Sequence, residues 1–373
     1  MKTLQILMVL VSLVTIVSCT KKKKGDYDLD PKETLSVNIM TEPPSLDWNK
    51  STDTTSAKIQ DNIMEGMVEY DFSDPDLGLV GSIAKSWTPA NEAKEWTFEL
   101  KKNIKWTDGV EVTAQHFIDS WERLLNPNTA SEYAYFLYGL ENAKEYNQGA
   151  IKDFSKVGAK AVDNYTIKVK LTGSQSYFPY LLTHHSTYPI RVDVIKEHGD
   201  KWTNPENMVT NGPFKMKVWD HDKAIILERN DIYFGEKPKI KNVIAYMIPE
   251  MSTAINLFDK GKLDAQLELP STELGVLKKK DEYSGAGILS IYYYGFNVKK
   301  KPMDNALVRK AISHAINRNE VTEMLAGGQI PLTSWVPPGM FGYEAELGTS
   351  FDVEQANKLL DKAGYKDRSK FPT

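Results

Sequence analysis

The sequence predicts an α/β fold, because segments with the two-residue period of strands alternate with segments that have the period of amphipathic helices. Apolar and polar residues alternate at 35–39, 96–100 and 165–171. A helical stripe of apolar side chains is clearest at 308–316 and 352–363. A length of 373 residues with 41% hydrophobic residues is typical of a globular protein with two or more domains.

The first predicted elements are a strand, a loop and a short helix. Residues 35–39 predict the strand, and two prolines within 42–47 predict the loop after it. Apolar residues recur every four positions from Ile59 to Met67, which predicts the helix. Gly66 lies near the predicted end of that helix, since glycine is common at helix C-termini.

The next elements are two strands with a capped helix between them. Residues 96–100 place their apolar side chains on one face and predict a strand, and Trp-Thr-Asp-Gly at 106–109 predicts a turn. Thr113 is the predicted N-cap of a helix that ends at Asn-Pro, residues 126–127. Residues 165–171 alternate again and predict another strand.

The later part of the chain continues the alternation. Ser252 is the predicted cap of a helix that stops at Gly261, and a short strand is predicted at 263–269. A longer strand rich in tyrosine is predicted at 288–296. Asp352 opens a capping box for the last helix.

The N-terminus has the pattern of a bacterial lipoprotein signal. The apolar run 4–17 holds about 14 residues, shorter than the roughly 20 of a membrane-spanning helix, so it predicts an export signal at 1–18. Small Ser18 stands before Cys19, the only cysteine, and this resembles a lipobox. The resemblance implies lipidation of Cys19, with an incidental cysteine as the alternative. Residues 19–35, with a lysine run, predict a flexible tether, with contact to anionic headgroups as the alternative.

Composition and motifs exclude several classes of function. A net charge of −4 argues against a nucleic-acid surface. The six histidines have no metal-ligand spacing, and the sequence lacks a GxSxG elbow, a Gly-rich phosphate loop and a GxGxxG turn. We therefore predict no enzyme, no metal and no cofactor. A glycosidase-like carboxylate pair stays open, because 50 acidic residues supply accidental pairs.

A series of motifs shows a family resemblance. They are Ala-Lys-Ser-Trp at 84–87, Trp-Thr-Phe-Glu-Leu-Lys at 96–101, Lys-Trp-Thr-Asp-Gly at 105–109, and the segments 112–117, 126–131, 209–214, 261–264, 308–311 and 363–365. With these motifs the chain resembles the oligopeptide-binding proteins of ABC importers. The resemblance implies a two-lobe fold of the periplasmic-binding-protein type (class II) with an inserted extra domain. It also implies binding of short peptides and delivery to the membrane permease subunits of an ABC importer.

The resemblance divides the body of the chain into three parts. It assigns 36–64 and 192–290 to lobe I, 65–191 to the inserted domain II, and 291–373 to a partial lobe III. Members of the family continue far beyond the Ala-Gly-Tyr motif, so we expect the second lobe to be incomplete. We further expect 291–373 to be loosely held and aggregation-prone, and peptide affinity to be lost or weakened.

The resemblance also implies a set of ligand-binding residues. They are Thr52, Thr54, Tyr133, Leu267, Glu268 and Tyr293. Three positions differ from the family: an acidic residue is usual at 52, Tyr-Asn is frequent at 267–268, and some members have a lysine at Leu325. For the two tyrosines, burial in the core is the alternative reading.

The expected protein is a monomer in the periplasm or at the cell surface, held to the membrane through Cys19. Two rival functions stay open. One is binding of another solute, an oligosaccharide or a metal chelate. The other is a role as a surface adhesin or chaperone, which would need no closing cleft.

Overall fold

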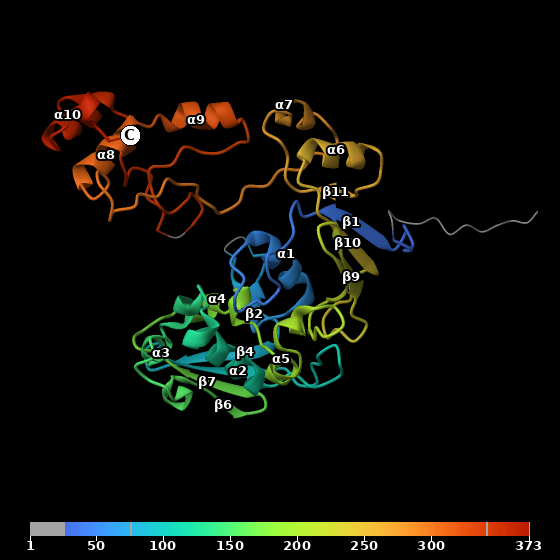
Figure 1. The fold of residues 1–373 in the computed structure, drawn as a ribbon. Helices are drawn as coiled ribbons and strands as arrows, with labels where there is room; N and C mark the ends of the chain where they lie inside the picture. The colour runs from blue at the N-terminus through green and yellow to red at the C-terminus, as the bar shows by residue number, and fades with distance from the viewer. Residues whose placement is uncertain (1–26, 75–76, 341, 373) are drawn as a thin grey trace, which may run out of the picture. The chain divides into compact units, whose positions relative to one another are not determined.

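The computed structural model describes residues 27–74, 77–340 and 342–372 (Figure 1). The chain divides into two compact units, Met1–Leu267 and Glu268–Thr373. The predicted signal and Cys19 lie outside the described residues, and the division into lobes I to III stays a prediction. In the described ranges, no helix is both long and apolar enough to cross a membrane.

The first unit contains a mixed five-stranded sheet in the order β11-β1-β10-β9-β8. Its strands are β1 (Thr34–Asn38), β8 (Phe214–Asp220), β9 (Ala224–Arg229), β10 (Asn242–Tyr246) and β11 (Ala265–Gln266). β1 runs parallel to β10 and β11, whereas β9 is antiparallel to both of its neighbours. Helix α1 (Thr54–Ile63) contacts β8, and α6 (Met251–Asp259) precedes β11.

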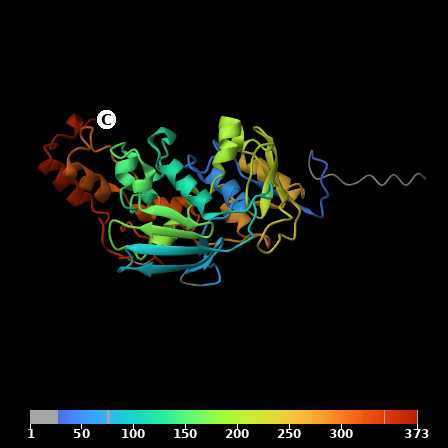
Figure 2. The ribbon, with the colours of Figure 1, turned by 90° about the horizontal axis from the view of Figure 1, so that it is seen from below.

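A second, antiparallel sheet follows the order β4-β5-β7-β6, and Figure 2 shows its cyan and green strands side by side. Its strands are β4 (Ala84–Ala90), β5 (Glu95–Leu100), β6 (Ala159–Asp163) and β7 (Thr166–Lys170). Helix α2 (Ala114–Leu125) packs against this sheet at β6. A small hairpin pairs β2 (Val68–Tyr70) with β3 (Leu79–Gly81).

Short helices connect these elements in the first unit. The α-helices are α3 (Ala143–Asn147), α4 (Phe178–Leu181) and α5 (Val192–His198). The 3-10 helices are η1 (Pro127–Thr129), η2 (Ala134–Leu137), η3 (Phe154–Lys156), η4 (His185–Thr187) and η5 (Gly199–Thr203).

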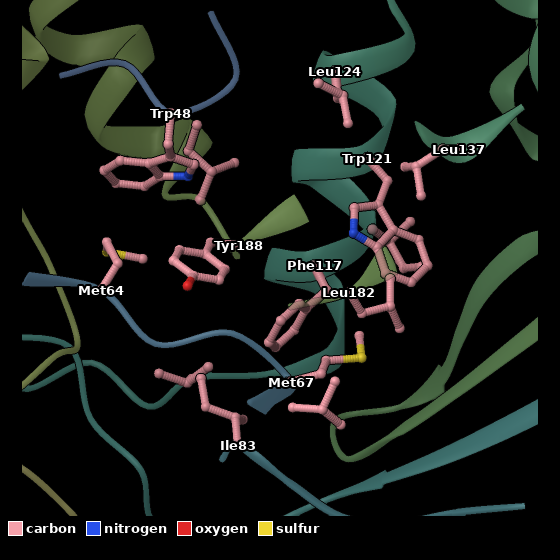
Figure 3. Packing of buried hydrophobic residues seen from close by; sticks show 14 of the residues in the cluster. Trp48, Met64, Met67, Ile83, Phe117, Trp121, Leu124, Leu137, Leu182 and Tyr188 are labelled. Atoms are coloured by element: carbon pink, nitrogen blue, oxygen red, sulfur yellow. The ribbon is translucent and has the colours of Figure 1, made fainter. Parts of the chain in front are cut away.

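One hydrophobic core cluster includes residues from both sheets of the first unit. The side chains of Trp48, Trp106 and Trp121 are fully buried in it. In Figure 3, Phe117 and Trp121 on α2 point toward Met67 and Leu182. The indole Nε1 of Trp121 donates to the carbonyl of Thr187 at 3.0 Å, so its polar atom is satisfied inside the core.

The second unit is helical. Its elements are α7 (Leu274–Leu277), α8 (Ala306–Ala315), α9 (Arg318–Leu325), α10 (Val353–Lys362) and η6 (Arg368–Lys370). Helices α8 and α10 pack together and bury Val308, Ala311, Ala356 and Leu359. From 268 to 372, leaving aside residue 341, no strand forms.

Most predicted elements of the first unit are confirmed, with corrections at helix ends. α2 begins after Thr113 and ends before Asn126, as predicted. However, α1 ends at Ile63, because the chain turns to an extended conformation at Met64 and carries Met67 into the core beyond the helix. The helix therefore ends near Gly66, as predicted, but before Met67, which lies in the core outside the helix.

The predicted N-cap of α6, Ser252, is wrong. Glu250 is the N-cap, and its carboxylate accepts the backbone N–H of Ser252, so Ser252 lies inside the first turn. Glutamate is a less common cap than serine, and the sequence pattern favoured the commoner residue.

Two predicted strands differ from the structure. The strand at 263–269 is reduced to the two residues of β11. Residues 288–296 form no strand, although they are rich in tyrosine. A strand needs a neighbouring chain for its hydrogen bonds, and no described segment pairs with this one.

Candidate functional site

The loop 47–53 and the first residue of α1 present two of the predicted ligand residues. The backbone carbonyl of Asp47 accepts the N–H groups of Lys50 and Ser51 at 2.8 and 2.9 Å, which folds the loop into a tight turn. Asp53 then caps the helix, because its carboxylate accepts the N–H and the hydroxyl of Ser56 at 2.8 and 2.6 Å. Thr52 and Thr54 stand exposed on either side of this cap.

The structure brings Tyr133 to the same loop. Tyr133 precedes η2 and is half-buried. Its hydroxyl donates to the backbone carbonyl of Thr52 at 3.3 Å, across 81 positions of sequence. Two of the predicted ligand residues are therefore neighbours, and the core alternative for Tyr133 does not hold.

An aromatic wall continues from Tyr133, formed with Phe136, His184 and His185. Tyr133 meets His184 edge to face, with ring centroids 4.7 Å apart, and His184 stacks on Phe136 at 4.4 Å. His184 and His185 lie 4.2 Å apart. The ring Nε2 of His185 is 3.4 Å from the carbonyl of Ser51, which ties the wall to the loop.

The aromatic wall carries no charge at neutral pH. Burial lowers the pKa of His184 to about 3, with a smaller contribution from His185. Burial also lowers the pKa of His185, against the opposing effect of its bond to the carbonyl of Ser51. Burial raises the pKa of Tyr133. A histidine with a pKa near 3 is a poor general base at neutral pH, so the wall suits contact with apolar or aromatic groups rather than proton transfer.

The remaining predicted residues lie at the end of the first unit or in the second unit. Leu267 is 61% exposed at the end of the first unit, and Glu268 is exposed at the start of the second. Tyr293, in the second unit, packs on Trp335 with ring centroids 4.7 Å apart and stays 60% exposed. Their role at a ligand site stays a prediction.

Sequence reasoning missed the two histidines of the wall. We considered histidines as metal ligands only, and the adjacent pair 184–185 has no such spacing. Across the ranges that the structure describes, no group of His, Cys, Asp or Glu side chains could hold a metal ion. Nothing local marks the pair as part of an aromatic wall, because its partners come from residues 133–136.

Two surface hollows lie elsewhere on the first unit. They measure about 380 and 450 Å³ and share Thr107, Lys215, Lys217 and Glu228 in their walls. Both lysines are paired with Glu228, at 3.5 and 2.7 Å. Neither hollow contains a predicted ligand residue, so we place the candidate site at Thr52 and Tyr133.

Comparison with known proteins gives the family. The model of the bacterial extracellular solute-binding proteins, family 5 Middle, matches residues 78–372. The oligopeptide-binding protein OppA of Bacillus subtilis is 35% identical over 351 residues, which cover 91% of this chain and 63% of that protein. About a third of the relative therefore has no counterpart in this sequence.

Solved structures show the same fold. The periplasmic oligopeptide-binding protein OppAIV of Borrelia burgdorferi matches with a TM-score of 0.83 at 34% identity, over 91% of this chain and 68% of that one. Haemophilus influenzae OppA, solved in complex with the peptide RPPGFSPFR, matches with a TM-score of 0.79 at 32% identity, over 90% and 68% of the two chains. The predicted α/β fold of the periplasmic-binding-protein type is confirmed.

Proposed function

Because the chain belongs to family 5 of the bacterial extracellular solute-binding proteins, we propose that it binds short peptides outside the cytoplasm for import by an ABC transporter. One observation of the site carries the proposal. The exposed loop at Thr52 lies beside an uncharged aromatic wall, and Tyr133 joins the two through a single hydrogen bond. The site suits holding a ligand: Ser186 Oγ lies 2.8 Å from the ring Nδ1 of His184, but this hydroxyl is buried and a ring with a pKa of about 3 is a poor base.

The chemistry of the site fits a peptide. An extended peptide offers backbone N–H and C=O groups, which exposed loop backbone can pair with whatever the peptide sequence. Aromatic rings give a side chain apolar area without demanding a charge. Thr52, Thr54 and Tyr133 are the proposed contacts from the first unit, with Leu267, Glu268 and Tyr293 as further candidates.

The proposal includes location and partners. The lipobox-like pattern at Ser18 and Cys19 supports a lipid anchor in the periplasm or at the cell surface. The permease subunits of the importer would be its protein partners, and the chain would act as a monomer without catalytic activity.

The test of the anchor is the variant Cys19→Ser. We expect it to move the protein from the membrane to the soluble fraction, because the lipid would be lost. Retention on the membrane at high salt would contradict this, since contact of the lysine run with headgroups is screened there.

The test of the ligand is photo-crosslinking of the full chain with tri- and tetrapeptides that carry a benzophenone. We expect crosslinks on 50–55 and 133–136, competed by unlabelled peptide. Matched oligosaccharide and nickel-chelate probes report the rival solutes, and capture of one of those in place of peptide would contradict the proposal. If none of the three kinds of probe binds at the site, the result favours a role as a surface adhesin or chaperone.

A further inference from the structure

We propose that Arg123 is the positioning residue of the candidate site. Its guanidinium holds the backbone of the loop 47–53, and so fixes where Thr52 stands opposite Tyr133. The positioning follows from contacts within the first unit. Its consequence for a ligand rests on the proposed function.

The first contact is a two-pronged ion pair. Arg123 Nη1 donates to Asp47 Oδ1 at 2.7 Å, and Nη2 donates to Asp47 Oδ2 at 2.6 Å. The side chains of Arg123 and Asp47 are only 17% and 9% exposed. Two parallel charge-assisted hydrogen bonds fix direction as well as distance, and the shielding from water strengthens them. Lysine, a point charge, cannot reproduce this fork.

Arg123 also binds Asn49, two residues after Asp47 in the loop. Arg123 Nη1 also donates to Asn49 Oδ1 at 3.0 Å. The amide Nδ2 of Asn49, which is buried, donates to Ser120 Oγ at 3.1 Å and to the carbonyl of Ser186 at 3.0 Å. Ser120 lies one turn before Arg123 on α2, so the same face of that helix holds the loop at two points.

The same helix end also carries Tyr133. α2 ends at Leu125, and η1 (Pro127–Thr129) leads directly to the segment that bears the tyrosine. The last turn of α2 therefore holds both partners of the bond from Tyr133 to Thr52: Arg123 binds the loop that carries Thr52, and the chain that leaves the helix carries Tyr133. Displacement of the loop from Arg123 would move the Thr52 carbonyl away from the tyrosine hydroxyl.

Arg191 is a matched control in the same unit. It forms the same kind of fork, with Nε and Nη2 on Asp193 at 2.8 and 2.5 Å, and its Nη1 donates to Asp108 at 2.7 Å. Its side chain is 8% exposed. It holds the turn at 106–109, and none of these hydrogen bonds or ion pairs joins it to the loop 47–53.

The experiment compares Arg123→Met, Arg123→Lys and Arg191→Met in the full chain. Thermal melting gives global stability, and amide hydrogen exchange gives local order. We expect both methionine variants to melt at a lower temperature. Only Arg123→Met should speed exchange of the Asn49, Lys50 and Ser51 amides, by about tenfold or more beyond the change in global stability. The exchange rates of Arg123→Lys should lie between those of the wild type and those of Arg123→Met. If Arg123→Met does not fold, Arg123→Lys is compared with the wild type instead.

The yield of peptide crosslinking is a second measurement, and a purely structural role of Arg123 would not change it. At a temperature where the variants are equally folded, Arg123→Met should lower crosslinking of the tripeptide probe at 50–55 by about tenfold, and Arg191→Met should not. Equal exchange at residues 49–51 in the two methionine variants would overturn the positioning role. If the wild-type chain captures no peptide, the proposed function fails, while the exchange data still decide whether Arg123 positions the loop.

Discussion

The two compact units differ in what they bury. The first unit encloses large side chains, with Trp48, Trp106 and Trp121 fully buried. The second unit buries small residues such as Val308 and Ala311, and it exposes large ones, with Tyr292 at 98%. Burial of apolar area is the main favourable term in folding, so stability should be concentrated in the first unit.

Two segments that the sequence predicts to be strands show where that difference arises. Residues 96–100 alternate between apolar and polar side chains, and residues 288–296 are rich in tyrosine, which is common in strands. β5 has β4 on one side and β7 on the other, so its backbone groups are paired and its inner face is covered. The later segment has no ladder among the described residues. The residue types of a segment show that it can be a strand, whereas a strand forms only where a neighbour supplies the hydrogen bonds.

The largest expected effect is a matched pair of leucine truncations. Leu124 on α2 is fully buried, and Leu359 on α10 is 8% exposed in a much smaller core. We expect Leu124→Ala to cost about 4 kcal/mol, and Leu359→Ala about 2 kcal/mol or less, because a thin core can collapse around the gap. Hydrogen exchange at increasing urea concentration measures the unfolding free energy of each unit separately. Leu347→Ala is the control, because this side chain is 68% exposed. Equal losses of unfolding free energy in Leu124→Ala and Leu359→Ala would contradict the proposed difference in stability between the two units.

The second expected effect concerns backbone protection. Amides of β5 should exchange about 100-fold or more slowly than those of 288–296, because only the strand amides are held by a ladder. Exchange followed by mass spectrometry at neutral pH measures both segments in one sample. Comparable protection of 288–296 would mean that this segment has a hydrogen-bonding partner in solution.

Sequence reasoning succeeded where the cause is local. The sequence predicts Thr113 and Asp352 at helix starts because a capping side chain acts within three residues of itself, and both residues are N-caps in the structure. The aromatic wall shows the opposite case. His184 becomes part of the candidate site only through contacts with Tyr133 and Phe136, about 50 positions earlier. Local pattern contains no information on such contacts, so the motif resemblance supplied Tyr133 and nothing supplied the histidine.

A smaller effect is the pH dependence of the first unit. The folded pKa of His184 is about 3, whereas an unfolded histidine titrates near 6.5. Between these values the unfolded chain binds the extra proton, so stability is full above pH 6.5 and falls as the pH drops toward 3. Each such histidine contributes a slope of about 1.4 kcal/mol per pH unit in that window.

The variant His184→Gln isolates this contribution. Between pH 6.5 and 4, the variant should reduce the slope of unfolding free energy against pH by the contribution of one histidine, about 1.4 kcal/mol per pH unit. Urea titration at several pH values measures this slope. His221→Gln is the control, because that ring is 71% exposed. A slope unchanged in His184→Gln would show that the ring is accessible to water in the folded chain.

The smallest expected effect separates the hydroxyl of Tyr133 from its ring. Tyr133→Phe removes one solvent-exposed hydrogen bond to the Thr52 carbonyl and should cost about 0.5 kcal/mol. Tyr133→Ala also removes the ring that lies 4.7 Å from His184. Water then reaches the imidazole, its pKa rises toward the ordinary value, and the acid-side slope becomes shallower. NMR titration of the His184 ring protons in both variants measures this directly. If Tyr133→Phe raises that pKa as far as Tyr133→Ala does, the hydroxyl rather than the ring shields the histidine, and the wall is held together by its link to the loop.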